Sequence, residues 1–192
     1  MNRRSFLAAT GVTLTTATAG CTSSSSDEPT TTPDGPVHST AVSEDNIEVS
    51  VGQWGRKNEV RYYDSDADQT KLLDAENGAF YDVNLTVNNL GERSKSVPSL
   101  TNFNLWVAGE AFPLLTELPD NVSWEKLRNR DDKRVLNEPF VATDRVKGGE
   151  SAFPNVSYDA SAKNPAYIKW TPSGKVEGED AVFLELGQRI TG

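Results

Sequence analysis

Ala79-Phe80-Tyr81-Asp82-Val83-Asn84-Leu85-Thr86-Val87-Asn88-Asn89 carries the most regular pattern in the chain. Val83, Leu85 and Val87 alternate with polar residues, and a period of two places successive side chains on opposite faces of a β-strand. Two other segments alternate in the same way, 47–51 and 103–107. Short strands that each have one apolar face predict an all-β protein, an antiparallel β-sandwich.

Weaker patterns of the same kind predict further strands at 60–63, 111–115, 140–143, 152–158, 166–170 and 181–186. One helical pattern competes with them. The segment 120–123 can cap a short helix through Trp124 and Leu127, with the basic Arg128 and Arg130 at its end. Because a helix of about two turns is marginal alone, we expect it on a long loop between strands.

The order of these features resembles a broad family of extracytoplasmic, telokin-like immunoglobulin sandwiches that are common in bacterial and archaeal lipoproteins. The likeness is carried by 79–89, by 103–107 with Gly109, and by 146–151 before Phe153. The long insertion at 117–138 and the missing acidic turn residue after Val107 depart from the family pattern. The resemblance implies an immunoglobulin-like β-sandwich outside the cytoplasm, and it implies no particular reaction.

The first residues resemble an export signal. The segment 2–7 is similar to the core of a twin-arginine signal, and the matching residues are Arg3, Arg4, Phe6 and Leu7. The mildly apolar stretch that follows is too short and too polar for a confident spanning helix. Twin-arginine export is associated with folded proteins, so the resemblance implies a domain that folds in the cytoplasm without disulfides.

Cys21 is the only cysteine of the chain, and it follows Thr18-Ala19-Gly20. Ala-Gly-Cys is similar to a lipobox, which implies removal of the signal peptide, residues 1–20, and a lipid on Cys21 that anchors the protein to the membrane. Thr18, at a position that is more commonly Leu, and the absence of Lys after Leu7 depart from the two motifs. An ordinary cleaved signal peptide with a chance cysteine is therefore the alternative.

Residues 21–45 are predicted to be the lipidated cysteine and a flexible stalk. From Thr22 to Thr32, eight of eleven residues are Ser or Thr, and several Pro and Gly follow. Such a composition cannot bury apolar surface. Residues 46–192 then form one β-sandwich domain, which keeps −6 of the formal charge of −9 because the signal holds +2 and the stalk −5.

The inventory of reactive side chains excludes several kinds of chemistry. The chain has one His and one Cys, whereas zinc and copper sites need several such ligands and a Ser-His-Asp site needs a positioned imidazole. The single imidazole, His38, falls in the predicted stalk. With 28 acidic and 19 basic residues, the chain is not expected to bind nucleic acid. No cofactor is expected.

Asp64, Asp66 and Asp68 are spaced like the first ligands of a calcium loop. An EF-hand also needs Gly at its sixth position and Glu at its twelfth, and Gln69 and Ala75 stand there instead. The EF-hand is therefore rejected. A looser Ca²⁺ site on the three aspartates stays a candidate, with a solvated acidic loop as the alternative.

Trp54 and Trp106 are candidates for a ligand-binding face, because flat aromatic rings can stack on sugars. Trp106 alternates out of register with Phe103, Leu105 and Val107, so its ring is expected on the opposite face of that strand, whereas Trp170 is expected inside the core.

A loop of mixed charge is expected to be solvated or to contact an acidic partner; its charged residues are Arg128, Arg130, Asp131, Asp132, Lys133 and Arg134.

Three sequons make Asn84, Asn121 and Asn155 candidate glycosylation sites. Asn84 and Asn155 fall on predicted strands, so each would have to point outward from its strand to accept a glycan.

Taken together, these patterns predict a non-catalytic binding or interaction module that a lipid on Cys21 holds on the extracytoplasmic face of the cell membrane. An envelope protein or glycan is the expected partner. One alternative is a structural component of the envelope that contacts surface-layer protein or glycan, and another is a hydrolase that uses paired carboxylates. The acidic, Asp-rich composition and Thr-rich signal resemble those of proteins from salt-loving archaea.

Overall fold

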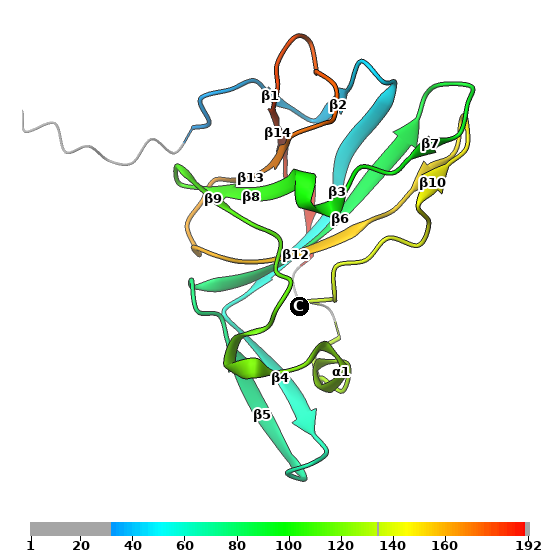
Figure 1. Ribbon diagram of the computed structural model, residues 1–192. Helices are drawn as coiled ribbons and strands as arrows, with labels where there is room; N and C mark the ends of the chain where they lie inside the picture. The colour runs from blue at the N-terminus through cyan, green and yellow to red at the C-terminus, as the bar shows by residue number, and fades with distance from the viewer. Residues whose placement is uncertain (1–31, 134, 191–192) are drawn as a thin grey trace, which may run out of the picture.

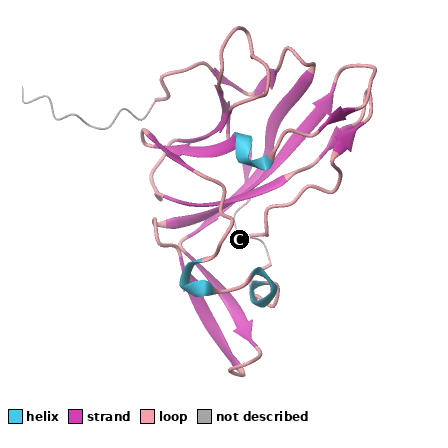
Figure 2. Cartoon of the chain, viewed as in Figure 1, coloured by secondary structure: helices cyan, strands magenta, loops and turns pink. Residues whose placement is uncertain are grey.

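The computed structural model describes residues 32–133 and 135–190, and these residues form an all-β sandwich with one short α-helix (Figures 1 and 2). The strands are β1 Val37–His38, β2 Thr40–Val42, β3 Ile47–Lys57, β4 Glu59–Asp64, β5 Gln69–Asp74, β6 Ala79–Asn89, β7 Lys95–Ser96, β8 Phe103–Val107, β9 Glu110–Phe112, β10 Arg145–Val146, β11 Ser151–Ala152, β12 Asn155–Ala160, β13 Ala166–Trp170, β14 Val182–Glu185 and β15 Gln188–Arg189. The helix is α1, Trp124–Leu127, and single 3-10 turns span Leu100–Asn102 and Pro119–Asn121.

Two sheets face each other across the main core. The first has the order β1-β14-β13-β8-β9, and in the second β6 pairs with β3 on one side and with β11 and β12 on the other. The alternating apolar residues of 47–51, 83–87 and 103–107 are buried between the sheets. Trp170 is buried there too and stacks on Phe103 with ring centroids 6.1 Å apart. The predicted all-β sandwich is confirmed.

Two edge pairings are parallel, unlike the antiparallel pattern that the sequence predicts. β1 pairs in parallel with β14, and β15 pairs in parallel with β3. Each of these edge strands has two residues, which is too short for a periodic pattern to reveal.

β1 and β2 also correct the predicted boundary between stalk and domain. Ala41 pairs with Val49 and is buried, and Val37 pairs with Phe183. The folded unit therefore includes residues 37–45, which the sequence analysis assigned to the stalk because of their polar composition. His38 belongs to β1, where its Nε2 atom is buried and has no hydrogen-bond partner among the described residues.

β6 buries both of its faces at its beginning, where Phe80 and Asp82 are buried on the face that points away from the main core. The insertion at 117–138, together with the β4–β5 hairpin, covers this outer face. They form a second hydrophobic cluster around Phe80 whose other members are Val60, Tyr62, Leu73, Leu118, Leu127, Val135 and Leu136. Figure 1 shows the hairpin and α1 together at the end of the molecule away from β1 and β2.

The short helix is confirmed on its long loop. Ser123 caps α1, because its Oγ accepts a hydrogen bond of 3.2 Å from the backbone N–H of Lys126. The strand predicted at 140–143 is wrong, since only Phe140 pairs with β12, through a single bridge to Asn155. The strand predicted at 152–158 is interrupted at Pro154, which cannot donate to a ladder.

Within the described ranges, no helix is long and apolar enough to cross a membrane.

Candidate functional site

A groove lies on the outer face of the second sheet, where the insertion at 117–138 stops covering it. Asn84 of β6 is directly opposite Asn155 of β12, and Phe153 lies two residues before Asn155, so the alternation of the strands places all three on this outer face. The other wall comes from α1 and the segment that follows the insertion. The groove has a volume of about 660 Å³ and is lined by Asn84, Trp124, Leu127, Arg128, Arg130, Asn137, Glu138, Pro139, Phe140, Phe153 and Asn155.

Two large aromatic side chains are exposed at this aromatic groove. Phe140 is 57% exposed and Phe153 is 68% exposed. Trp124 is half-buried, and its Nε1–H donates to the carbonyl oxygen of Thr116 at 3.2 Å, which fixes the indole against the wall. Rings left in water around one concavity are typical of ligand sites, because an ordinary core would have buried them.

The carboxylate of Asp82 lies beneath the groove and is only 5% exposed. Its Oδ1 accepts hydrogen bonds from the Nδ2 of Asn155 and the hydroxyl of Ser157, both at 2.9 Å. Asn137 donates its backbone N–H to Oδ1 at 3.1 Å and its Nδ2 to Oδ2 at 2.7 Å. The buried carboxylate thereby ties the wall segment of the groove to β12, and this network is a feature that the sequence analysis missed.

Arg130 holds the same wall from the opposite side. Its guanidinium donates to the carbonyl oxygens of Asp132, at 2.6 Å, and of Leu136, and to Oδ1 of Asn137 at 2.8 Å. Partial burial lowers the pKa of Arg130, and the charge of Asp82 opposes that shift. The loop of mixed charge is therefore not simply solvated, since Arg130 is one of its structural ties.

Asn155 does not fulfil its predicted role as a glycosylation site. The residue is 8% exposed, and its Nδ2, the atom that a glycan would need, donates to Asp82. Because this bond fixes the orientation of the amide, Oδ1 points away from Asp82, and it finds no hydrogen-bond donor among the described residues. Asn84 and Asn121 are exposed, as glycosylation requires, and glycosylation of Asn121 stays a prediction.

The two tryptophans predicted as a ligand face do not form one. Trp106 lies outside the main core, as its register predicts, but it is only 8% exposed because Tyr167 and Phe183 pack against it at 5.8 and 5.7 Å. Trp54 stacks on Tyr81 at 6.0 Å, while the guanidinium of Arg189 lies 5.4 Å from the centre of a Trp54 ring. The indole N–H of Trp54 donates to a backbone carbonyl of Gly187 at 3.0 Å.

Two aspartates of the candidate calcium loop, Asp64 and Asp66, are already paired with lysines. Asp64 is buried, and its carboxylate contacts Nζ of Lys71 at 2.7 Å and Nζ of Lys126 at 3.3 Å. Lys126 also pairs with Asp66 at 2.7 Å, and Asp68 accepts a hydrogen bond from the hydroxyl of Tyr63. The ammonium groups stand where a cation would bind, so the calcium candidate is wrong. Across residues 32–133 and 135–190, no three His, Cys, Asp or Glu side chains gather closely enough to hold a metal.

This lysine cluster gives stability a specific pH dependence. The hydrogen bond from Lys71 is the largest influence that lowers the pKa of Asp64 to about 2, with burial opposing it and Lys126 adding to it. Since the pKa of an Asp in the unfolded chain is about 3.9, the stability that the charge of Asp64 contributes is complete above that pH and is lost as the pH falls towards 2.

We expect the melting temperature of Asp64→Asn to lie below that of the wild type at pH 7. In a series of thermal melts, the difference should shrink between about pH 4 and pH 2. A constant difference would contradict the role of the charge.

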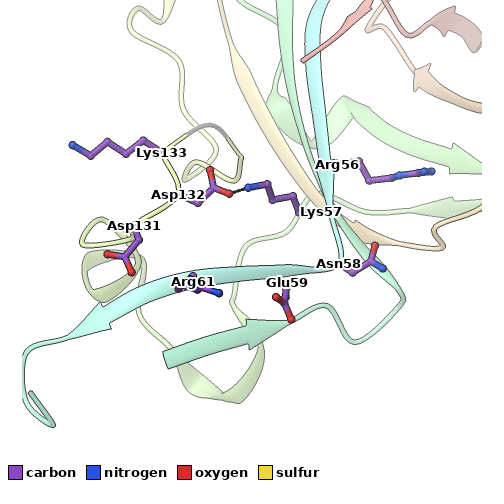
Figure 3. A pocket seen from close by; sticks show the side chains of 8 residues that line it. All are labelled: Arg56, Lys57, Asn58, Glu59, Arg61, Asp131, Asp132 and Lys133. Carbon is purple, nitrogen blue, oxygen red and sulfur yellow. Dashed lines mark ion pairs between the residues drawn. The ribbon is translucent and has the colours of Figure 1, made fainter. Parts of the chain in front are cut away.

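A second cleft, of about 840 Å³, separates the base of β4 from the loop around Asp132 (Figure 3). Lys57 forms an ion pair with Asp132 across it. Arg56 lies at its margin and donates to the carbonyl oxygen of Ala162 at 2.8 Å. Its lining mixes both signs of charge without aromatic rings: Arg56, Lys57, Asn58, Glu59, Arg61, Asp131, Asp132 and Lys133. Because this charged cleft mixes positive and negative side chains, its lining does not indicate one class of ligand.

Several predicted residues lie outside the described residues. They are the signal residues Arg3, Arg4, Phe6 and Leu7, the lipidation site Cys21, and Arg134 of the loop of mixed charge.

No protein-family model matches the chain, and no curated protein matches it. Among solved structures, the chain is similar to YcdA, a candidate lipoprotein from Bacillus subtilis, with 14% identity, a TM-score of 0.44, and coverage of 78% of this chain and 39% of YcdA. It is also similar to MPT63, a secreted protein from Mycobacterium tuberculosis, with 13% identity, a TM-score of 0.42, and coverage of 80% of this chain and 99% of MPT63. The chain thus spans less than half of YcdA.

Proposed function

We propose that the protein is a non-catalytic binding module that a lipid on Cys21 anchors to the outer face of the cell membrane, and that it binds its ligand in the aromatic groove. The observation that carries this proposal is the exposure of Phe140 and Phe153 on one cavity. The cavity of about 660 Å³ has the size of ligand sites in general, and rigid strands and the Asp82 network hold its walls.

The position of the first described residues is compatible with this proposal. The described chain begins near β1, at the end of the molecule opposite the β4–β5 hairpin and α1 (Figure 1). Attachment at that end would leave α1, which forms one wall of the aromatic groove, away from the point of attachment.

The groove is poorly equipped for hydrolysis by paired carboxylates. Such a mechanism needs two carboxyl groups on either side of the reacting bond. Glu138 is the only carboxylate among the described lining residues, and it pairs with Arg128 at 2.8 Å. Binding without catalysis is therefore the favoured function of the groove.

The binding function is tested by substituting the two exposed rings together. We expect Phe140→Ala combined with Phe153→Ala to reduce at least tenfold the retention of solubilised envelope material on the immobilised full chain, because both exposed aromatic rings of the groove are removed. The melting temperature should change little, since both rings are exposed.

Leu72→Ala is the matched control, because Leu72 is an exposed apolar residue of β5 and does not line the groove. This variant should bind like the wild type. Equal retention by the groove variant and the wild type would contradict the proposed site.

The anchor is tested separately at Cys21. A thiol is needed for attachment of the lipid, so Cys21→Ser should move the protein from the membrane fraction into the medium. Fractionation followed by immunoblotting measures the distribution. If the serine variant stays on membranes as the wild type does, the proposed lipid anchor is wrong.

A further inference from the structure

We infer that the ligand of the aromatic groove is a neutral glycan of the cell envelope, an inference that rests on the proposed binding function. Three properties of the groove support this inference. Its charged side chains are already paired, the edge of β12 that borders it is already hydrogen-bonded, and its exposed rings, Phe140 and Phe153, lie beside polar side chains.

The charged residues of the groove already have partners. Arg128 pairs with Glu138 at 2.8 Å. Arg130 donates to four acceptors in the segment 132–137 and interacts with the negative charge of Asp82. Among the described residues at the groove, Arg128 and Arg130 are balanced by Glu138 and Asp82, and the domain as a whole is acidic, so an anionic ligand would gain little and face repulsion. These charges favour a ligand without net charge.

The occupied strand edge disfavours an extended peptide. Peptides often bind by adding a strand to a free sheet edge. At β12 this edge is already paired: the N–H of Phe140 donates to the carbonyl of Asn155 at 2.9 Å, and the N–H of Asn155 donates to the carbonyl of Phe140 at 2.8 Å. Farther along the edge, the N–H of Leu115 donates to the carbonyl of Ser157 at 2.8 Å. A peptide would thus lack the main-chain bonds that normally give it affinity.

The mixture of side chains matches the two-sided chemistry of a sugar. The electron-rich faces of Phe140 and Phe153 can receive the C–H groups of a sugar ring. Asn84 is exposed beside them, and its side-chain amide can both donate to and accept from hydroxyl groups. The Arg128–Glu138 pair offers further donors and acceptors at the wall. A purely apolar chain such as a lipid tail would remove the Asn84 amide from water and offer it no hydrogen-bond partner.

The inferred glycan is a separate molecule that the groove binds and not a sugar attached to Asn84, although Asn84 belongs to a sequon. Asn84 lies in the middle of β6, a strand that pairs with β12 on one side and β3 on the other. An enzyme that attaches a glycan to Asn84 must bind the backbone around that residue, and the pairing of β6 with its neighbouring strands prevents this binding. If the protein is exported already folded, Asn84 would reach the outside in that protected state.

The test is isothermal titration of the full chain in detergent with three sets of probes. These are neutral oligosaccharides of glucose, mannose and N-acetylglucosamine, uronic acid oligosaccharides of the same length, and an uncharged peptide with Phe and Leu side chains. We expect a neutral oligosaccharide to bind with an affinity that 0.1 M and 1 M salt leave within twofold. Phe153→Ala should weaken that binding at least tenfold, and Phe153→Trp should restore it, because a larger ring can still stack.

The outcomes separate this inference from the function on which it rests. If the peptide or the uronic acid probe binds in the groove and the neutral sugars do not, the inference of a neutral glycan is wrong and the proposed binding function stands. If no neutral sugar binds while envelope material is still retained in a Phe153-dependent manner, the inference of a neutral glycan is again wrong. If nothing is retained and the groove variants match the wild type, both fail.

Peptide mass analysis of protein from the native host distinguishes a bound glycan from an attached one. Trypsin releases 72–93 with Asn84, 96–126 with Asn121 and 148–163 with Asn155 as separate peptides. The inference predicts the unmodified mass for 72–93. A sugar mass on that peptide would overturn it, because the groove would then hold the chain's own glycan.

Discussion

Asp82→Ala is expected to lower the free energy of unfolding by about 1–3 kcal/mol. The buried carboxylate accepts hydrogen bonds from Asn137, Asn155 and Ser157. Asn137 is exposed and the Ser157 hydroxyl keeps the carbonyl oxygen of Asn137 as an acceptor at 2.6 Å, so the buried donor that loses its acceptor is Nδ2 of Asn155. Arg130 would also lose the nearby negative charge that opposes the cost of its burial. Urea denaturation of the variant and the wild type measures the loss.

Asp74→Ala is the control for this substitution, because Asp74 is exposed on β5. Its free energy of unfolding should stay within about 0.5 kcal/mol of the wild-type value. If Asp82→Ala also cost less than about 1 kcal/mol, Asp82 would not be the tie between the groove wall and β12.

Phe80→Ala is expected to cost about 3–5 kcal/mol for a different reason, the cavity that it leaves. Phe80 is fully buried on the outer face of β6 and belongs to the second hydrophobic cluster with residues of the β4–β5 hairpin and the insertion. Loss of the ring removes apolar contacts from both, and α1, which carries Trp124, packs on the same cluster through Leu127. The variant should therefore lose both stability and groove binding.

The control for Phe80→Ala is the same substitution at Phe153, which is exposed. Phe153→Ala should lower the free energy of unfolding by less than about 0.5 kcal/mol while weakening binding. The two variants thus separate stability from recognition. Equal stabilities for Phe80→Ala and Phe153→Ala in urea denaturation would contradict the burial that the structure shows.

The sandwich itself could be predicted because one physical signal dominates it. Val83, Leu85 and Val87 point into the main core, and a period of two follows directly from strand geometry. The intervening residues Phe80 and Asp82 could not be assigned from that pattern. Their burial depends on the insertion at 117–138, which lies far away in the sequence and covers the outer face of β6.

The same reason explains why Trp106 is covered. Its register correctly predicts a position outside the main core, but Tyr167 from β13 and Phe183 from β14 pack against it there. Phe140 and Phe153 fall in segments that the sequence predicts as ordinary strands. Alternation is the signal that indicates an outward position for Phe153, because it lies out of register with Ala152, Val156 and Tyr158, which are buried.

Asn155 shows that a motif does not predict accessibility. Its sequon is intact, yet the side chain is bonded to Asp82 and buried. Asp64 and Asp66 show the same for metal binding, since Lys71 and Lys126 contact them only in the folded chain. Sequence spacing establishes which groups are available, and tertiary contacts decide which partner each group takes.

Whether the aromatic groove is the binding site is decided by NMR titration of the ¹⁵N-labelled full chain with the oligosaccharide that binds tightest. If the groove binds it, the largest shifts occur in the side-chain amide of Asn84 and the backbone amides of Phe140 and Phe153, while those around Trp106 stay unchanged. Shifts centred on Trp106 or on Arg61 in the charged cleft would contradict binding in the groove.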